Sequence, residues 1–289
     1  MEQIENNELK IAVNPIGAEL SSIKKKSNQK QYLWQGDLEF WKSQAPVLFP
    51  IVGGLKDEFY LYKNKKYSVP KHGFIRYNPD LKLEKPAGDQ IVYSYASTEA
   101  TKKNYPFDFK FKITYELADN RIIVNHEVKN TGDDILYFAI GGHPAFNCPL
   151  NNQESYEDYY IQLQNGHNTL SYVLNSSGLI TDQTKQVMEG DKIHLTTHLF
   201  DDDALIFKNI KAEKATLVHK ENGAILSVNF SDFPDLGIWA KPKAPFICVE
   251  PWLGYADLEN SNHILAEKEG IQSLNATEVH HSSYTISIL

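Results

Sequence analysis

Residues 107–128 read FDFKFKITYELADNRIIVNHEV, and this stretch decides the fold class. Apolar side chains alternate with polar ones on both sides of a short polar break at Asp119 and Asn120. Alternation with a period of two predicts half-buried strands, and the polar pair between them predicts a hairpin turn. The stretch therefore predicts two antiparallel β-strands that each turn one face to a core.

The same pattern recurs along the chain, whereas helical periodicity is scarce. A second hairpin is expected within residues 215–230, around the turn Asn222-Gly223, and the alternation returns at residues 284–288. The best helical candidate is short, from Asp37 to Ser43. Many short strands separated by turns predict an all-β fold, a large antiparallel β-sandwich with few short helices. We expect residues 1–289 to form it as a single domain.

Composition narrows the classes of function. The chain has 289 residues and a net charge of −8, which argues against nucleic acid as a partner. No apolar run reaches the ~18 residues of a membrane span, and the acidic start does not resemble a secretory signal. Cys148 and Cys248 lack the spacing of a zinc site, which indicates a reduced, cytoplasmic protein without disulfides or metal. We expect a monomer or homodimer that acts on a small molecule.

Residues 141–147, Gly-Gly-His-Pro-Ala-Phe-Asn, carry the strongest indication of chemistry. They follow the apolar run Ile135 to Ile140, whose length and side chains predict a buried strand. Two glycines permit an unusual turn or a close backbone approach, and the proline fixes the chain beyond the histidine. His143 is therefore expected at the rigid end of a strand, where a fold can present it to a cleft.

Two further strand ends carry titratable side chains. Glu250 closes the apolar run that begins at Phe246, where a carboxylate is costly unless it is paired or its pKa is raised. A raised pKa would make it a better base near neutral pH. His72 lies four residues before Arg76, which is one of only two arginines among 29 basic residues. Because arginine binds polyoxygen groups in a fork, this pairing favours a ligand site over a plain loop.

Other candidates are weaker. Asp203 borders an apolar strand and can point inward, whereas Asp201 and Asp202 are better explained as a solvated turn, because the cluster lacks the spacing of a calcium loop. Lys56 follows a glycine-rich corner and is a candidate ligand-binding cation. Trp252 is a core residue or a platform for the apolar face of a sugar. His126 falls on the apolar face of its strand, which indicates a core histidine with satisfied hydrogen bonds.

The sequence resembles the aldose 1-epimerase (galactose mutarotase) family, and within it the LacX-like branch of bacterial proteins. The resemblance rests on four stretches in family order, and together they span nearly the whole chain: His72-Gly73-Phe74, His143 to Asn147, Phe200 to Phe207 and Cys248 to Pro251. It implies a β-sandwich of the galactose mutarotase type, a supersandwich. It also implies interconversion of the α and β anomers of a free aldohexose without a cofactor.

The resemblance assigns roles to the matching residues. Glu250 resembles the base that removes the proton from the sugar O1 hydroxyl, and His143 resembles the acid that protonates the ring oxygen O5. His72 and Asp203 resemble residues that bind the sugar hydroxyls. Galactose mutarotases carry an aromatic residue at the position of Ala145, and an arginine whose nearest equivalent here is Lys56. These differences bear on the choice of sugar more than on the reaction.

Three alternatives stay open. A hexose-6-phosphate 1-epimerase would share the fold and the His143 and Glu250 pair, with Arg76 and Lys71 as cations for the phosphate. A non-catalytic sugar-binding or sensing domain would need the tryptophans but not both members of that pair. A glycosidase would need two carboxylates flanking the scissile bond, for which Asp203 and Glu250 are the available pair.

Overall fold

A computed structural model gives the structure of the chain and describes residues 1–84 and 88–289. Nearly all regular structure in it is β, and every pair of named strands is antiparallel. The described residues contain one short α-helix, α1 (Glu99–Lys102), and short 3-10 turns. This confirms the expected all-β sandwich with few short helices. No helix among the described residues is long and apolar enough to cross a membrane.

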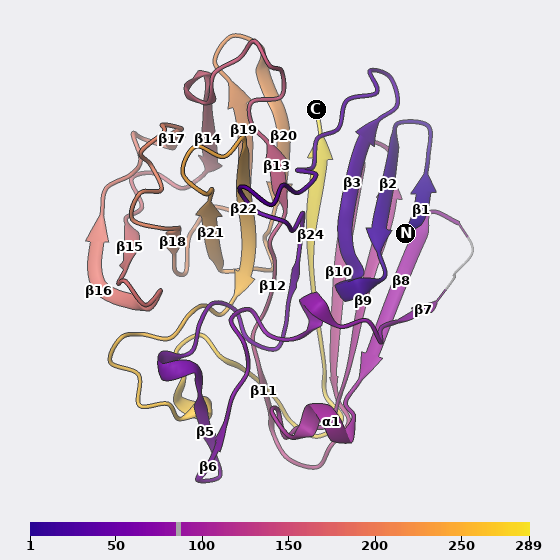
Figure 1. Cartoon of the computed structure of the whole chain (residues 1–289), viewed down its shortest axis with the longest axis vertical. Helices are drawn as coiled ribbons and strands as arrows, with labels where there is room; N and C mark the ends of the chain where they lie inside the picture. The colour runs from indigo at the N-terminus through magenta and orange to yellow at the C-terminus, as the bar shows by residue number, and fades with distance from the viewer. Residues whose placement is uncertain (85–87) are drawn as a thin grey trace.

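The largest sheet has nine strands in the order β17-β14-β19-β20-β24-β10-β9-β8-β7 (Figure 1). In chain order its strands are β7 (Lys82–Glu84), β8 (Gln90–Ala96), β9 (Phe109–Ala118), β10 (Arg121–Asn130), β14 (Tyr159–Gln164), β17 (Lys192–His194), β19 (Lys214–His219), β20 (Gly223–Asn229) and β24 (Val279–Ile288).

An eight-stranded sheet carries the candidate site residues His143 and Glu250 at its middle. Its main path runs β16-β15-β18-β21-β22-β12-β4, and β13 pairs separately with β22. The strands are β4 (Val47–Leu48), β12 (Ile140–Gly142), β13 (Ala145–Asn147), β15 (Ser171–Leu174), β16 (Ile180–Lys185), β18 (Leu205–Phe207), β21 (Asp235–Trp239) and β22 (Phe246–Leu253).

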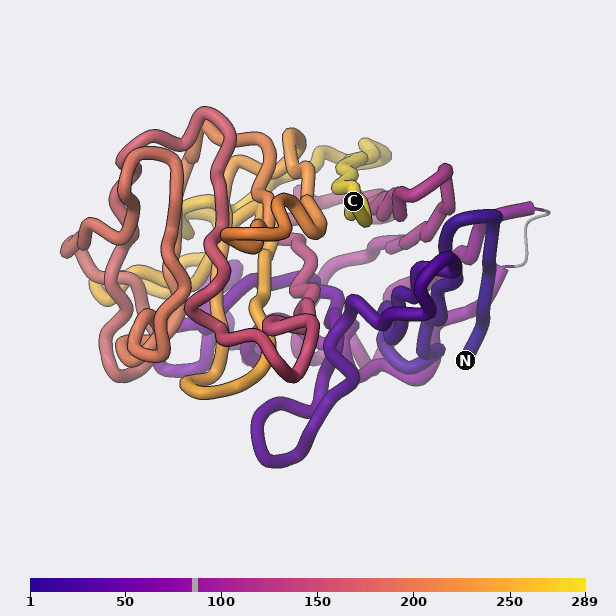
Figure 2. The backbone as a smooth tube through the Cα atoms, turned by 90° about the horizontal axis from the view of Figure 1, so that it is seen from above, coloured from indigo at the N-terminus to yellow at the C-terminus, as the bar shows by residue number. Residues whose placement is uncertain are grey.

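Three small sheets complete the fold. They are a three-stranded sheet of β1 (Glu2–Glu5), β2 (Leu9–Asn14) and β3 (Glu19–Lys25), a pair of β5 (Tyr60–Tyr62) and β6 (Lys65–Tyr67), and a pair of β11 (Leu136–Phe138) and β23 (Gln272–Leu274). Seen from above, the indigo N-terminal strands lie at one end of the molecule and the orange strands at the other (Figure 2).

Aromatic side chains fill the space between the layers. Phe49, directly after β4, lies with its ring 5.2 Å from the rings of both Phe109 and Phe111 on β9. Further along the same buried face of β9, the Tyr115 hydroxyl donates a 2.7 Å hydrogen bond to the Ala18 carbonyl. One continuous core therefore joins the three-stranded, nine-stranded and eight-stranded sheets.

Both expected hairpins are confirmed, and their turns show which residues close them. β9 and β10 pair from Ala118 opposite Arg121, so Asp119 and Asn120 form a two-residue turn, with Asp119 at a φ of 54°. In the second hairpin His219 pairs with Gly223, so the turn lies at residues 220–222 rather than at Asn222-Gly223. A register shift between Leu217 and Val218, from Leu217 opposite Leu226 to Val218 opposite Ala224, precedes this turn.

The helix expected from Asp37 to Ser43 is wrong. Asp37 and Trp41 instead pair in an isolated antiparallel bridge that closes a tight turn. The Asp37 carboxylate accepts a 2.8 Å hydrogen bond from the Glu39 backbone N–H, which gives the chain a local alternative to a helical hydrogen bond. This turn places Trp41 at the candidate site described next.

Candidate active site

A cavity of about 320 Å³ gathers most of the candidate residues, although they come from distant parts of the chain. The predicted site residues that line it are His72, Arg76, His143, Asp203, Glu250 and Trp252. Its size is suited to a small molecule such as a monosaccharide, and its walls combine aromatic rings with a few polar groups.

Strand β22 positions Glu250. All eight residues of this strand are buried, and it is an internal strand that pairs with β21 on one edge and with β12 and β13 on the other. Glu250 lies opposite Gly237, and the Glu250 side chain is only 2% exposed. A Cβ atom on Gly237 would lie 2.5 Å from the indole of Trp252, so glycine there leaves room for the tryptophan beside Glu250.

His143 lies in the short connection between β12 and β13, both of which pair with β22. Its backbone N–H donates a 3.1 Å hydrogen bond to the Pro46 carbonyl. A Cβ on the preceding Gly142 would lie 2.6 Å from the Tyr284 hydroxyl, so this position requires glycine. The backbone thus holds the imidazole with Nε2 3.2 Å from Glu250 Oε2.

Burial shifts the pKa of each member of this pair in the direction that favours its uncharged form. It raises the pKa of Glu250 well above its usual value of 4.5, and the nearby Lys71 charge opposes the rise. It lowers the pKa of His143 well below 6.5, and the positive charge of Arg76 lowers it further. Both shifts favour uncharged side chains, so the two groups together hold a single exchangeable proton near neutral pH.

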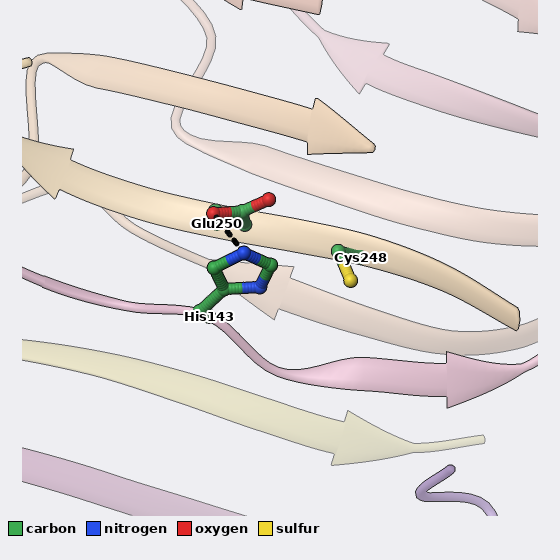
Figure 3. Close-up of side chains that lie close together, drawn as sticks. All are labelled: His143, Cys248 and Glu250. Carbon is green, nitrogen blue, oxygen red and sulfur yellow. Dashed lines mark ion pairs between the residues drawn. The ribbon is translucent and has the colours of Figure 1, made fainter. Parts of the chain in front are cut away.

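Cys248 lies two residues before Glu250 on the same face of β22, and its thiol forms a buried group with His143 and Glu250 (Figure 3). The ligand atoms of the three residues lie within 4.8 Å of one another. In Figure 3 the sulfur lies off to one side of the line that joins His143 to Glu250. Burial raises the pKa of Cys248 well above its usual value, which keeps the thiol protonated.

His72 is held in a left-handed backbone conformation with a φ of 66°. The His72 Nδ1 accepts a 3.1 Å hydrogen bond from the Gly53 backbone N–H, and the His72 backbone N–H donates to the Gly53 carbonyl at 2.9 Å. Burial lowers the pKa of His72 well below 6.5. The neutral ring therefore carries its proton on Nε2, which is available as a donor at the cavity wall.

Arg76 and Lys71 bring positive charge to the same cavity. The Arg76 guanidinium lies over the Tyr77 ring, 4.7 Å from its centroid. Arg76 Nε is buried and makes no hydrogen bond to any described residue. A buried donor without a partner is costly, so this nitrogen is suited to a ligand oxygen.

Asp203 is separated from its acidic neighbours. It adopts a φ of 75° directly before β18, its carboxylate accepts a 2.8 Å hydrogen bond from Ala204 N–H, and it lines the cavity. Asp201 instead pairs with His198 at 2.8 Å and Asp202 with Lys185 at 3.3 Å. Only one member of the acidic cluster therefore belongs to the site.

Lys56 is not brought to the cavity. Its ammonium donates a 3.1 Å hydrogen bond to the Ser261 carbonyl, and its backbone N–H donates to Asp257. These contacts hold Lys56 against the segment after β22, so it is not among the residues that line the cavity.

Two more tryptophans line the cavity beside Trp252. Trp239, like Trp34 and Trp252, is expected from the sequence as a core residue or a platform for a sugar, and it meets the His143 ring edge-on at 5.9 Å. Trp41 is not expected there; it lies on the His143 ring with centroids 4.8 Å apart and an interplanar angle of 30°. Trp41 falls in the segment expected to be helical, and no pattern in the sequence places it next to His143.

The fold and the cavity define a class of protein, namely large antiparallel β-sandwiches that hold a buried histidine and carboxylate pair at the base of a pocket for a small molecule. A family model described as aldose 1-epimerase matches residues 2–282. The chain therefore belongs to the aldose 1-epimerase family.

Individual relatives agree with this assignment. The chain is 32% identical to the plasmid-encoded protein LacX of Lactococcus lactis subsp. lactis over 298 residues, with 99% of each chain covered. A galactose mutarotase related enzyme from Lactobacillus acidophilus superimposes with a TM-score of 0.94 at 33% identity, covering 100% of this chain and 97% of that one. A galactose mutarotase-like protein from Lactobacillus casei gives 0.93 at 29% identity, with both chains fully covered. The predicted family and its LacX-like branch are confirmed.

Proposed function

We propose that this protein is an aldose 1-epimerase that interconverts the α and β anomers of a free aldohexose. The observation that carries the proposal is the buried pair of His143 Nε2 and Glu250 Oε2, 3.2 Å apart in the lining of a cavity of about 320 Å³. Opening a pyranose ring needs one proton removed and one delivered at two oxygens bonded to the same carbon. A base and an acid held this close are suited to that exchange.

Glu250 would remove the proton from the O1 hydroxyl. The O1 electrons then form the C1 carbonyl, the C1–O5 bond breaks, and O5 takes a proton from His143. Rotation about C1–C2 turns the other face of the aldehyde towards O5. Ring closure reverses each proton transfer, so the pair returns to its starting state, and the cycle requires no oxidant, reductant or cofactor.

The pair must place its one proton on His143 when the sugar binds. In the free protein burial favours the proton on Glu250, as the raised pKa of that carboxyl indicates. A hydrogen bond from the O1 hydroxyl would stabilise the Glu250 carboxylate, and the positive charge of Lys71 acts in the same direction. Substrate binding would thus move the proton to the side chain that needs it.

The cavity wall supplies groups that would bind and orient the ring. His72 Nε2–H would donate to one sugar oxygen, and the carboxylate of Asp203 would accept from a hydroxyl. Trp252 and the stacked Trp41 offer apolar faces of the kind that pack against sugar C–H groups. Lys56 has no part in this proposed binding set, because its ammonium is used by the Ser261 carbonyl.

A hexose-6-phosphate is the second candidate substrate. Lys71 and Arg76 both line the cavity, and the buried Arg76 Nε has no partner among the described residues. Together they would neutralise a phosphate better than they would serve a neutral sugar. This candidate keeps the reaction and changes only the substrate.

The test is a polarimetric assay of freshly dissolved α anomers, using glucose, galactose and their 6-phosphates. We expect the wild-type protein to accelerate mutarotation of at least one of them, and Glu250→Gln and His143→Asn each to lower that acceleration by about 10²–10⁴-fold. Arg76→Met would reduce activity on a phosphorylated sugar more than on a free one if the phosphate candidate is correct.

Two results would contradict the proposal. Full activity in either Glu250→Gln or His143→Asn would remove the acid–base assignment. A wild-type protein that binds sugars in calorimetry but accelerates none of them would instead support a non-catalytic binding domain. Circular dichroism of each variant establishes that the fold is retained.

A further inference from the structure

A buried ion pair of Asp257 and Lys268 lies next to the cavity. Neither residue is among those that line the cavity with His143 and Glu250. Lys268 Nζ is 2.8 Å from Asp257 Oδ1, and the two side chains are only 4% and 3% exposed. The ammonium also donates a 2.7 Å hydrogen bond to the Tyr255 carbonyl. Burial lowers the pKa of Lys268, and the attraction of Asp257 opposes that shift.

The second oxygen of Asp257 is used as well. Asp257 Oδ2 accepts a 2.9 Å hydrogen bond from the Lys56 backbone N–H, and the Asp257 N–H donates to the Gly54 carbonyl at 2.9 Å. Two hydrogen bonds thus join residues 53–56 to residue 257. Gly53 has a φ of 72°, and a Cβ there would lie 2.5 Å from the Cβ of Ala256, so the two segments are in close contact.

The segment held in this way is the one that orients His72. The Gly53 backbone N–H donates to His72 Nδ1 at 3.1 Å, and the Gly53 carbonyl accepts from the His72 backbone N–H at 2.9 Å. The tautomer of His72 therefore depends on where Gly53 points its N–H. Gly53 belongs to the segment that Asp257 contacts at Gly54 and Lys56, and Asp257 is in turn paired with Lys268.

We propose that Asp257 and Lys268 are positioning residues for His72, acting through residues 53–56 to keep its proton on Nε2 and its ring against the substrate. This inference rests on the proposed function, in which His72 donates a hydrogen bond to a sugar oxygen. It assigns a role to two residues that touch neither the sugar nor the reacting pair.

The chemistry of the pair fits orientation better than stability. A buried ion pair is often no more stabilising than apolar residues of the same volume, because both charges must leave water. A carboxylate does, however, offer two acceptor oxygens in one rigid plane. Here one oxygen is used by Lys268 and the other by the backbone of the 53–56 segment, so the ammonium fixes the plane in which the second oxygen lies.

The experiment combines kinetics with a direct reading of the His72 tautomer. Lys268→Met removes the charge and keeps the aliphatic length, and the double variant Asp257→Asn/Lys268→Met removes both charges if the single variant does not fold. The matched control is Asn130→Ala, which deletes buried hydrogen bonds to Asp134 and Leu274 instead. Nitrogen-15 imidazole spectra report the tautomer, and polarimetry reports kcat and KM.

We expect Lys268→Met to raise KM or lower kcat/KM by about 10–100-fold, as for a small misplacement of a binding group. The His72 spectrum should change from the Nε2–H form to a mixture of tautomers. The same change made in a His72→Ala background should cost little further activity, because the group being positioned is already gone. Asn130→Ala should leave the His72 spectrum as in the wild type.

Either of two outcomes would overturn the inference. One is a wild-type His72 spectrum in a folded Lys268→Met or double variant. The other is an activity loss that adds fully to the loss from His72→Ala. If the wild-type protein proves inactive on every sugar, the proposed function fails, but the tautomer measurement still decides whether Asp257 and Lys268 position His72.

Discussion

Two of the buried histidines, His143 and His126, lie at different sheets, and their surroundings differ in what they offer a proton. His143 belongs to the eight-stranded sheet, with Nε2 3.2 Å from a carboxylate and a cavity in front of it. His126 belongs to the nine-stranded sheet, 1% exposed, near the rings of Phe111, Phe233 and Tyr284. Neither nitrogen of His126 has a hydrogen-bond partner among the described residues.

Burial alone lowers the pKa of both histidines, so a shifted pKa does not by itself distinguish a site from a core. The partner and the open space make the difference. In the proposed mechanism His143 exchanges a proton with Glu250 and with a molecule in the cavity, whereas His126 has no hydrogen-bond partner among the described residues. The expectation that His126 would be a satisfied core histidine is therefore right about its burial and wrong about its hydrogen bonds.

The largest expected effect separates the two regions by activity. The double variant His143→Asn/Glu250→Gln should lose about 10²–10⁴-fold in mutarotation rate, and no more than the worse single variant, because the two groups act as one unit. His126→Leu should leave the rate unchanged. Polarimetry on the wild type, the two single variants, the double variant and His126→Leu checks this. Fully additive losses in the double variant would argue against a shared proton.

The pH dependence of the rate should have two limbs that belong to the pair. Because the pKa of His143 is lowered from 6.5, the acid limb, where the pair takes up a second proton, should lie below pH 6.5. Because the pKa of Glu250 is raised from 4.5, the basic limb, where the pair loses its proton, should lie above pH 4.5. A pH profile of kcat/KM measures both, and an acid limb above pH 6.5 would contradict the assignment.

Replacing His126 should change the stability of the fold, although it leaves the activity unchanged. Removing the unpartnered imidazole in His126→Leu should raise the free energy of unfolding by about 1 kcal/mol near neutral pH, since the two unsatisfied nitrogens of that ring are then gone. Denaturant unfolding followed by circular dichroism measures the change. A loss of more than 1 kcal/mol would indicate that His126 has a partner, such as a buried water.

The same substitution should also flatten the stability against pH. The pKa of His126 is lowered from 6.5 to about 3 in the folded protein. Between pH 6.5 and about 3, this histidine is therefore protonated in the unfolded chain but not in the folded protein. Because the unfolded state binds the extra proton, stability is lost as the pH falls through this range. His126→Leu removes this contribution, so the difference between the variant and the wild type should grow as the pH falls through that window.

The smallest expected effect concerns Lys56. Lys56→Met should leave KM for the sugar within experimental error, because the Lys56 ammonium bonds to the Ser261 carbonyl and does not line the cavity. Arg76→Met, which removes a cavity cation, should raise KM. A rise in KM for Lys56→Met as large as that for Arg76→Met would show that Lys56 does contribute to ligand binding.

Much of this architecture could be predicted from local pattern. Period-two alternation located the β9–β10 hairpin, and the glycines and proline beside His143 marked the end of β12 at the cavity. Glu250, expected at a strand end because Pro251 follows it, lies instead inside β22, where Pro251 continues the strand. Two expectations failed for different reasons. Lys56 is a candidate by residue type, but its ammonium is fixed by a carbonyl 205 residues away, which no local pattern shows. The helix expected around Trp41 fails locally, because the Asp37 carboxylate accepts the Glu39 N–H two residues on and competes with the helical hydrogen bond.

The burial of β22 on both edges has a consequence for how this site can evolve. Cys248, Glu250 and Trp252 share one face of a strand whose register is fixed by neighbours on both sides. A one-residue insertion after Phe246 would turn Glu250 to the opposite face, and every ladder partner would resist the slip. Changes in ligand preference are therefore open to substitution at the cavity walls, at Trp41, Arg76 and Asp203, while the strand that carries Glu250 tolerates neither insertions nor deletions.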